Sequence, residues 1–313
     1  MTVRDLRRTD APRLVQFLKN EFPEEEALLG TRPEGVERIV QRLFRPHVRL
    51  LLGLLRWFGR PIFRFFVIES ENRIVATTLL SFSHRAGYVS MVVVDPAYRR
   101  RGLARELLER ARVATRARGK PFVALDVLAS NAPARALYER IGYRPLRATS
   151  YFVHEHPETL LPEPTNVAGL RRFQSGDAKA LAEVARRGVP TEVQTVLPIT
   201  HHELTGSAWA DQMLATESAA WVIDDGSGPK AWVLAAVSPA TEAAHLSAPI
   251  VDGSVTPEQA TALVRVAGAW CAAHRAPRLM AMVPEENGRG RDAMVGAGFH
   301  DVLPIWTLYR PVD

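Results

Sequence analysis

Hydrophobic and polar residues alternate along three consecutive stretches of the first half, and short polar turns separate the stretches. They read IFRFFVIES (62–70), RIVATTLLSFSH (73–84) and YVSMVVVD (88–95). A period of two residues with many β-branched side chains is typical of half-buried strands. The turns at Glu71-Asn72 and Ala86-Gly87 are short enough to be hairpin turns. The pattern therefore predicts three consecutive antiparallel strands.

A helical period follows immediately. The stretch LARELLERARVATRARG (103–119) places apolar residues on one helix face and ends at Gly119, as expected for an amphipathic helix. A buried strand (PFVALDVLA), a short helix (NAPARALYERIG) and a final strand pair around YFVHEH (151–156) are predicted to complete a domain. Before the three strands we predict a short strand at 3–6, a helix capped by Thr9 or Asp10, and a helical region over 33–57.

The second half repeats this order of elements. VRDLRR (3–8) returns as VAGLRR (167–172), and NAPARALYERIGY (131–143) returns as NGRGRDAMVGAGF (287–299). Matching elements in matching order indicate an internal duplication. Between the copies, HEHPETLLPEPTN (154–166) is rich in proline and polar residues, as linkers are. We therefore predict a first domain over 1–155, a linker over 156–166 and a second domain over 167–313.

Composition narrows the class of protein. The most apolar stretch, 48–68, is interrupted by four arginines, which excludes a membrane-spanning helix because a span needs about 20 nearly uncharged residues. A single cysteine, Cys271, excludes a disulfide framework and a cysteine-based zinc site. The N-terminus lacks the apolar core of a secretory signal, so a cytoplasmic location is expected.

Charge is distributed unevenly between the halves. Residues 1–156 carry a net charge of +12 and residues 157–313 a net charge of −6. A basic half favours an anionic ligand. Nucleic acid is disfavoured as a partner, since the basic residues form no stripe interleaved with aromatic residues and the second half is acidic.

The stretch DPAYRRRGLARELL (95–108) lies between a predicted strand and a predicted helix. Such a helix start presents backbone N–H groups and a partial positive charge, Gly102 permits a close backbone approach, and arginines bind phosphate bidentately. Taken alone, the stretch fits a nucleic-acid patch, a solvated helix start or a cradle for a phosphate-bearing ligand. A Rossmann fold would need G-x-G-x-x-G after the first strand, and the sequence has no such motif there.

Two motifs together resemble those of the GCN5-related N-acetyltransferases (GNAT). The acetyl-CoA loop [Q/R]-x-x-G-x-[G/A] matches at Arg99, Gly102 and Ala104. The second signature, an Asn followed by A-x-x-L-Y-x-x-x-G-[F/Y], matches from Asn131 through Tyr138 to Tyr143. The resemblance covers residues 3–153. It implies an α/β fold of two tandem GNAT-like domains, each a twisted mixed sheet flanked by helices.

The resemblance also implies roles for individual residues. Tyr138 would protonate the departing CoA thiolate, since a phenol with a pKa near 10 is protonated at neutral pH. Asp126, 12 residues earlier, would be the general base. An ordered water that Ser90, Tyr88 or His84 orients is an alternative general base. Alternatively, Asp126 has a structural role and pairs with a residue such as an arginine. The implied cofactor contacts are backbone groups of Val92, Val93 and Val94 with the pantetheine arm, residues Arg99, Arg100, Arg101, Gly102, Leu103 and Ala104 with the pyrophosphate, and Asn131 with the cofactor or its own loop.

The function implied is acetyl transfer from acetyl-CoA to a primary amine by direct attack, without a metal or a covalent enzyme intermediate. The acceptor amine could belong to a protein N-terminus, a lysine or a small molecule. The resemblance does not determine the oligomeric state. The second copy has Met294 where the first has Tyr138, and a thioether cannot donate a proton, so that copy is predicted to be non-catalytic. A non-catalytic acyl-CoA-binding protein is the rival. The tandem arrangement is also similar to that of mycothiol synthases, which acetylate a small amine.

Two further stretches are candidates for a metal site or an acceptor site. THHEL (200–204) lacks the H-E-x-x-H spacing of a zinc site. LLLGLLRWF (50–58) fits an exposed apolar patch for an acceptor or partner, but a buried amphipathic helix is the more frequent explanation of such a stretch. In the family it resembles, this segment often flanks the acceptor site, so Trp57 and Phe58 are candidate acceptor contacts.

Overall fold

The structure is a computed structural model, which describes residues 2–21, 63–161, 166–200, 204, 217–237 and 243–313. The expected helix over 33–57, the candidates Trp57 and Phe58, and the histidines and glutamate of THHEL lie outside these residues. Within the described part of the chain, no helix is both long and apolar enough to cross a membrane.

Apart from the strand pair predicted around YFVHEH, the described residues of the first half contain the strands and helices that the sequence pattern predicts, in the predicted order. Its strands are β1 (Val3–Asp5), β2 (Phe63–Ser70), β3 (Arg73–Phe82), β4 (Ala86–Val94), β5 (Phe122–Leu128) and β6 (Arg144–His154). Its helices are α1 (Ala11–Glu21), α5 (Leu103–Arg116) and α6 (Ala132–Arg140). β2, β3 and β4 pair in antiparallel fashion, which confirms the three predicted hairpin strands.

The second half repeats this order of elements. Its strands are β7 (Leu170–Arg172), β8 (Glu217–Asp224), β9 (Pro229–Val237), β10 (Ala243–Leu246), β11 (Ile250–Val251), β12 (Arg278–Pro284) and β13 (His300–Pro311). Its helices are α7 (Ala178–Arg187), α8 (Thr191–Val196), α11 (Pro257–Ala273) and α12 (Gly288–Gly296).

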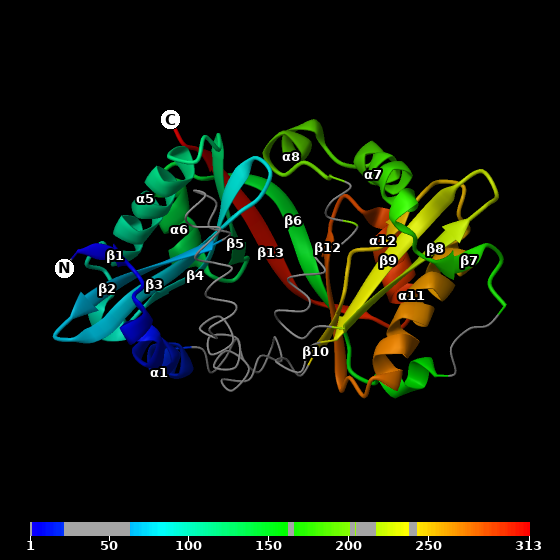
Figure 1. Cartoon of the computed structure of the whole chain (residues 1–313), viewed down its shortest axis with the longest axis horizontal. Helices are drawn as coiled ribbons and strands as arrows, with labels where there is room; N and C mark the ends of the chain where they lie inside the picture. Colours follow the sequence, from blue (N-terminus) through cyan, green and yellow to red (C-terminus); the bar gives the residue numbers. More distant parts are fainter. Residues whose placement is uncertain (1, 22–62, 162–165, 201–203, 205–216, 238–242) are drawn as a thin grey trace.

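All of these strands join one mixed sheet (Figure 1). The strand order is β1-β2-β3-β4-β5-β13-β6-β12-β10-β9-β8-β7, and β11 pairs with β9. Only β4–β5 and β10–β12 are parallel neighbours among the described pairs. These two parallel pairs occupy equivalent positions in the two halves. The predicted fold class, α/β with twisted mixed sheets flanked by helices, is confirmed.

The last strand of the chain lies inside the first half of the sheet. β13 pairs with β5 on one side, where Thr307 is opposite Asp126, and with β6 on the other. In turn, β6 pairs with β12 of the second half. The predicted strand pair around YFVHEH was therefore wrong: this segment forms one strand, β6, and its neighbours both come from the second half. Local sequence patterns cannot identify this exchange because the partners are about 150 residues apart.

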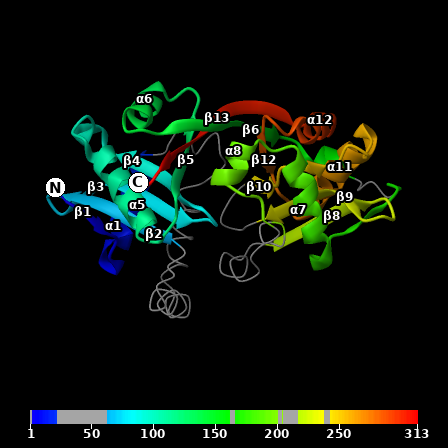
Figure 2. The ribbon, with the colours of Figure 1, turned by 90° about the horizontal axis from the view of Figure 1, so that it is seen from above.

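Alternate residues of each strand pack under helices on opposite faces of the sheet. In β2, Phe66 and Ile68 belong to the core beneath α5, whereas Val67 belongs to the core beneath α1. In β8, Trp221 and Val222 divide in the same way between the cores of α11 and α7. α8 lies between the two halves (Figure 2).

Part of the predicted linker belongs to the second core. A short 3-10 helix (Pro157–Leu160) follows β6, and Leu160 is fully buried. Leu160 packs so closely on α11 that a Cβ atom added at Gly268 would lie 2.4 Å from its Cδ1. The glycine is required there because α11 and Leu160 approach closely. The division into two domains stays a prediction, and the sheet that joins them is continuous.

An ion network at the first strand of each half supports the duplication. Arg4 of β1 pairs with buried Asp10 and with Glu69, and Arg171 of β7 pairs with Asp177 and Asp224. Hydrogen bonds from Arg4 help to lower the pKa of Asp10 to about 2. The network aligns β1 with β7, so that residue 4 corresponds to 171. The match of VRDLRR with VAGLRR was therefore out of register by three residues, and the shared Asp-Ala pair that follows is the better landmark.

Candidate functional site

β4 and β5 pair with each other over only part of their length. Their register runs from Ala86 opposite Phe122 to Val89 opposite Leu125. Both strands continue beyond these four pairs, β4 to Val94 and β5 to Leu128. Where parallel strands stop pairing, the ladder no longer satisfies the N–H and C=O groups on their facing edges. The candidate residues Val92, Val93 and Val94 lie on this part of β4.

A β-bulge bends β4 just after its last pair with β5. Leu79 is opposite Ser90 and Thr77 is opposite Val93, so β4 has one extra residue between these pairs. Met91, within the bulge, has a φ of 55°. Bulges kink a strand and increase its local twist, which accounts for the end of the β4–β5 pairing at this position.

The arginine loop follows β4 directly and is held by its own hydrogen bonds. The Asp95 carboxylate accepts a hydrogen bond from the Ala97 amide at 2.9 Å. Arg99 Nε donates to the Val94 carbonyl at 3.0 Å, and an Arg101 Nη donates to the Ala97 carbonyl, also at 3.0 Å. Two of the three arginine side chains therefore contact the loop itself.

Two residues of this loop have a left-handed backbone just before the start of α5. Arg100 and Gly102 both have positive φ, 61° and 83°, and such left-handed residues in a turn create a concave set of N–H groups that binds anions. The first hydrogen bond into α5 runs from Glu106 N to Gly102 O. The amides of Leu103 and Ala104 thus have no acceptor within the helix, and the helix dipole adds positive potential there.

Tyr138 lies on α6 and is 6% exposed. It belongs to the same apolar cluster as Leu103 and Val127, against which Val92 and Val94 also pack. Its ring is tilted against that of Tyr143, with 5.9 Å between the ring centroids. Asn131 is the N-cap of α6, and its Oδ1 accepts a hydrogen bond from Ala134 N at 3.1 Å. Asn131 therefore caps α6, and its contact with the cofactor or its loop stays a prediction.

Asp126 is the first residue of β5 beyond the last pair with β4. Its Oδ1 accepts a hydrogen bond from Thr307 Oγ1 of β13 at 2.7 Å. Tyr88 lies beside Asp126, and burial next to that carboxylate raises the pKa of Tyr88 well above its usual value. The hydroxyl group that donates to Asp126 comes from β13.

Tyr138 and Asp126 lie on opposite faces of the sheet. Val127 faces Tyr138 in the core beneath α5, so its neighbour Asp126 points to the other face. Arg147 of β6 shares this second face, since Asp126, Thr307 and Arg147 are paired in a row across β5, β13 and β6. Both candidate catalytic residues flank the place where the β4–β5 ladder ends, one from each side. Of the weaker alternatives, Tyr88 contacts Asp126, whereas the carbonyl of His84 accepts a hydrogen bond from Lys120.

The second half has the same parallel strand pair and the same helix cap, but it lacks the counterparts of the Tyr138 hydroxyl and the Asp126 carboxylate. β10 pairs in parallel with β12 over four residues, from Ala243 opposite Arg278 to Leu246 opposite Ala281. Asn287 caps α12 with the same 3.1 Å bond as Asn131 caps α6. A shift of 156 positions places Met294 at Tyr138 and Met282 at Asp126. Sequence reasoning noted the first of these replacements but missed Met282, although the same shift identifies it.

Sequence comparison finds an acetyltransferase family and a relative that match part of the chain. Residues 33–143 match the family described as acetyltransferase (GNAT). A mycothiol acetyltransferase from Beutenbergia cavernae is 36% identical over 91 residues, which is 29% of this chain and 31% of that protein. The chain thus spans about a third of the curated relative it matches.

Solved structures match the whole chain. A tandem GNAT protein from the clavulanic acid biosynthesis pathway covers 99% of this chain and 98% of its own, with a TM-score of 0.64 and 15% identity. A GCN5-related N-acetyltransferase from Sphaerobacter thermophilus covers 99% and 95%, with a TM-score of 0.63 and 16% identity. The fold is therefore that of a tandem GNAT protein. Residues 33–143 of the first half are the part of the chain that matches the acetyltransferase (GNAT) family.

Proposed function

We propose that the protein is an acetyl-CoA-dependent N-acetyltransferase that acetylates a primary amine by direct attack within a ternary complex. The observation that carries this proposal is the end of the β4–β5 ladder. There, an anion-binding loop follows β4, and Tyr138 and Asp126 lie on either side. Each of these features belongs to the half that matches the acetyltransferase family.

The residues at this place fit acetyl-CoA as a co-substrate. The facing edge of Val92, Val93 and Val94 offers backbone groups to the amides of the pantetheine arm. The amides from Arg101 to Ala104, at the start of α5, would hold the pyrophosphate, since helix N-termini bind such anions. Arg99 and Arg101 shape the loop through their bonds to its carbonyls, and Arg100 is exposed beside it.

The proposed chemistry uses one proton donor and one proton acceptor. Acetyl-CoA supplies an activated acetyl group; a bond forms from the amine nitrogen to the acetyl carbon as the carbon–sulfur bond breaks. Asp126 takes the proton that the amine loses, directly or through a water, and Tyr138 gives its hydroxyl proton to the sulfur. The hydrogen bond from Thr307 positions the Asp126 carboxylate.

A small-molecule amine is the acceptor class that the sequence match favours, because the matched relative is a mycothiol acetyltransferase. The test is the release of CoA thiol from acetyl-CoA with a panel of amines: amino sugars, amino acids, a lysine peptide and an N-terminal peptide. We expect turnover with at least one small amine. Binding of acetyl-CoA without thiol release over the whole panel would instead support a non-catalytic acyl-CoA-binding protein.

Replacing Gly102 with alanine is expected to weaken acetyl-CoA binding about tenfold, or roughly 1.4 kcal/mol. A Cβ atom there would meet nothing within 4 Å, so the cost comes from the φ of 83° that alanine resists by about 1–2 kcal/mol. Relaxation of that angle moves the amides that hold the pyrophosphate. Calorimetric titration with acetyl-CoA measures the effect.

Gly119→Ala is the matched control. Gly119 also has a positive φ, 65°, and open space around its Cα, but it lies beyond the other end of α5. The control should lose similar stability and keep its affinity. Equal affinities of the two variants would contradict a role of the loop in binding.

A further inference from the structure

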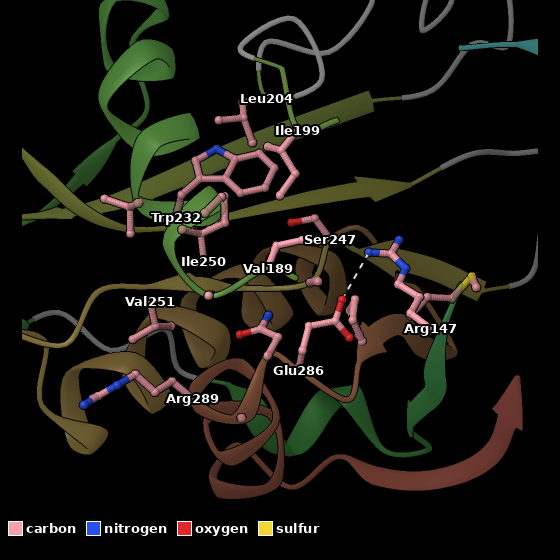
Figure 3. A pocket seen from close by; sticks show the side chains of 18 residues that line it. Arg147, Val189, Ile199, Leu204, Trp232, Ser247, Ile250, Val251, Glu286 and Arg289 are labelled. Atoms are coloured by element: carbon pink, nitrogen blue, oxygen red, sulfur yellow. Dashed lines mark ion pairs between the residues drawn. The ribbon is translucent and has the colours of Figure 1, made fainter. Parts of the chain in front are cut away.

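The second half contains a cavity of about 610 Å³ at the counterpart of the first-half site. It begins where the β10–β12 ladder ends: Ser247 and Ile250 line one side, and Met282 and Pro284 line the other. Val189, which follows α7, and Trp232 of β9 close it on the face that α7 covers (Figure 3). A volume of this size holds a small organic molecule.

Three side chains that line this cavity carry buried polar atoms without a hydrogen-bond partner among the described residues. They are the indole nitrogen of Trp232, Nε of Arg147 and one carboxylate oxygen of Glu286. Trp232 is only 4% exposed. A buried polar group without a partner costs about 1–3 kcal/mol, and such groups are uncommon in folded proteins. Two of the three side chains, Arg147 and Glu286, lie together at one end of the cavity, which indicates that a ligand with polar groups binds at that end.

A long ion pair between Arg147 and Glu286 forms the polar end of the cavity. Arg147 reaches it from β6 of the first half, and its Nη1 lies 3.7 Å from Glu286 Oε1, too far for a hydrogen bond. Figure 3 shows this pair at one end of the cavity, with Trp232 and Leu204 at the other and Arg289 extending away from it. The charges of Arg147 and Glu286 compensate each other. An ionic ligand would therefore lose its hydration in the cavity without gaining an opposite net charge to pair with.

The helix start next to this cavity is unlike the one in the first half. At the N-terminus of α11, Thr256 and Gln259 form a capping box that occupies the amides of both residues. Asp252, just before it, accepts hydrogen bonds from the amide and hydroxyl of Ser254. Amides that are already bonded, beside a carboxylate, do not attract a pyrophosphate. The ligand is therefore of a different class from CoA.

We propose that this cavity is a second binding site, for an uncharged small molecule with a branched apolar body and a terminal amide. The amide carbonyl accepts a hydrogen bond from Arg147, and its N–H donates to Glu286. The apolar body packs against Val189, Ile199 and Ile250. The site goes beyond acetyl transfer, and it holds whether or not the first half is an active enzyme.

The test is NMR of protein labelled with ¹⁵N at the indole nitrogens, one signal for each of the six tryptophans. The Trp232 signal is assigned with Trp232→Phe. Three probes share a branched alkyl body: 4-methylpentanamide, 4-methylpentanoate and 3-methylbutylamine. We expect the amide at millimolar concentration to shift the Trp232 signal, and the carboxylate, the amine and acetyl-CoA to leave it unchanged.

Matched variants locate the site. Glu286→Gln should weaken binding of the amide about tenfold, while Glu285→Gln, its exposed neighbour, should not. Val189→Phe fills the cavity and should abolish binding, whereas Val295→Phe adds the same bulk at a side chain that is 60% exposed. The proposal is overturned if none of the probes shifts Trp232, if an ionic probe binds as well as the amide, or if the amide binds equally to Val189→Phe.

Discussion

Replacing Tyr138 with phenylalanine is expected to lower acetyl transfer by roughly 10²–10⁴-fold, the range that general acid catalysis contributes, with no change in acetyl-CoA affinity. The ring of Tyr138 is buried in the cluster that includes Leu103 and Val127. Phenylalanine fills the same space, so the fold is preserved while the proton donor is lost. Thiol release measures turnover, and calorimetry measures binding.

Tyr143→Phe provides the control for this substitution. Tyr143 packs against Tyr138 in the same cluster, and its buried hydroxyl has no hydrogen-bond partner in the described part of the chain. Burial raises the pKa of Tyr143, so the group stays neutral. Its removal should leave turnover almost unchanged. A proton-donor role for Tyr138 is contradicted if both variants lose turnover equally, or if Tyr138→Phe keeps full activity.

A chain that ends at Gly298 is expected to lose cooperative folding, the first half included. It lacks β13, which lies between β5 and β6. Ile305, Leu308 and Val312 are each at most 3% exposed, and burial of such a side chain contributes about 1.5–3 kcal/mol. Their sum is comparable with the 5–15 kcal/mol that usually separates folded from unfolded protein. Thermal unfolding followed by near-ultraviolet circular dichroism tests this expectation.

A chain that ends at Val312 is the control, since it lacks only the exposed Asp313; it should unfold as the full chain does. Residues 1–155 alone should show no cooperative transition. The milder change Leu308→Ala should cost about 2–5 kcal/mol. If residues 1–155 unfold cooperatively with a native near-ultraviolet spectrum, β13 is not required by the first half.

The parts of the fold that depend on neighbouring residues could be predicted from the sequence. The hairpin strands β2 to β4 follow from alternation, and α5 follows from the spacing of Leu103, Leu107 and Leu108. The loop motif and the Asn131 cap are also local, because each sits within a few residues of the helix that it begins. These features were enough to point to the GNAT fold.

The parts that depend on distant pairing could not be predicted. The Thr307 hydroxyl reaches Asp126 only because β13 lies in the first half of the sheet. The hydrophobic periodicity of a sequence does not show which strands become neighbours. The same limit applies to Arg147, which lies in the first half of the sequence and lines the cavity of the second. The repeat was visible, but its register near residue 4 was not, because a three-residue LRR match carries less information than the Arg4–Asp10 ion pair.

The position of β13 also bears on how the protein is made. Ribosomes release the chain from its N-terminus, and domains usually fold as they emerge. Here the edges of β5 and β6 that pair with β13 stay unpaired until residues 300–311 have left the ribosome, and exposed edges invite aggregation. The sheet of the first half therefore cannot be completed before β13 has been synthesised.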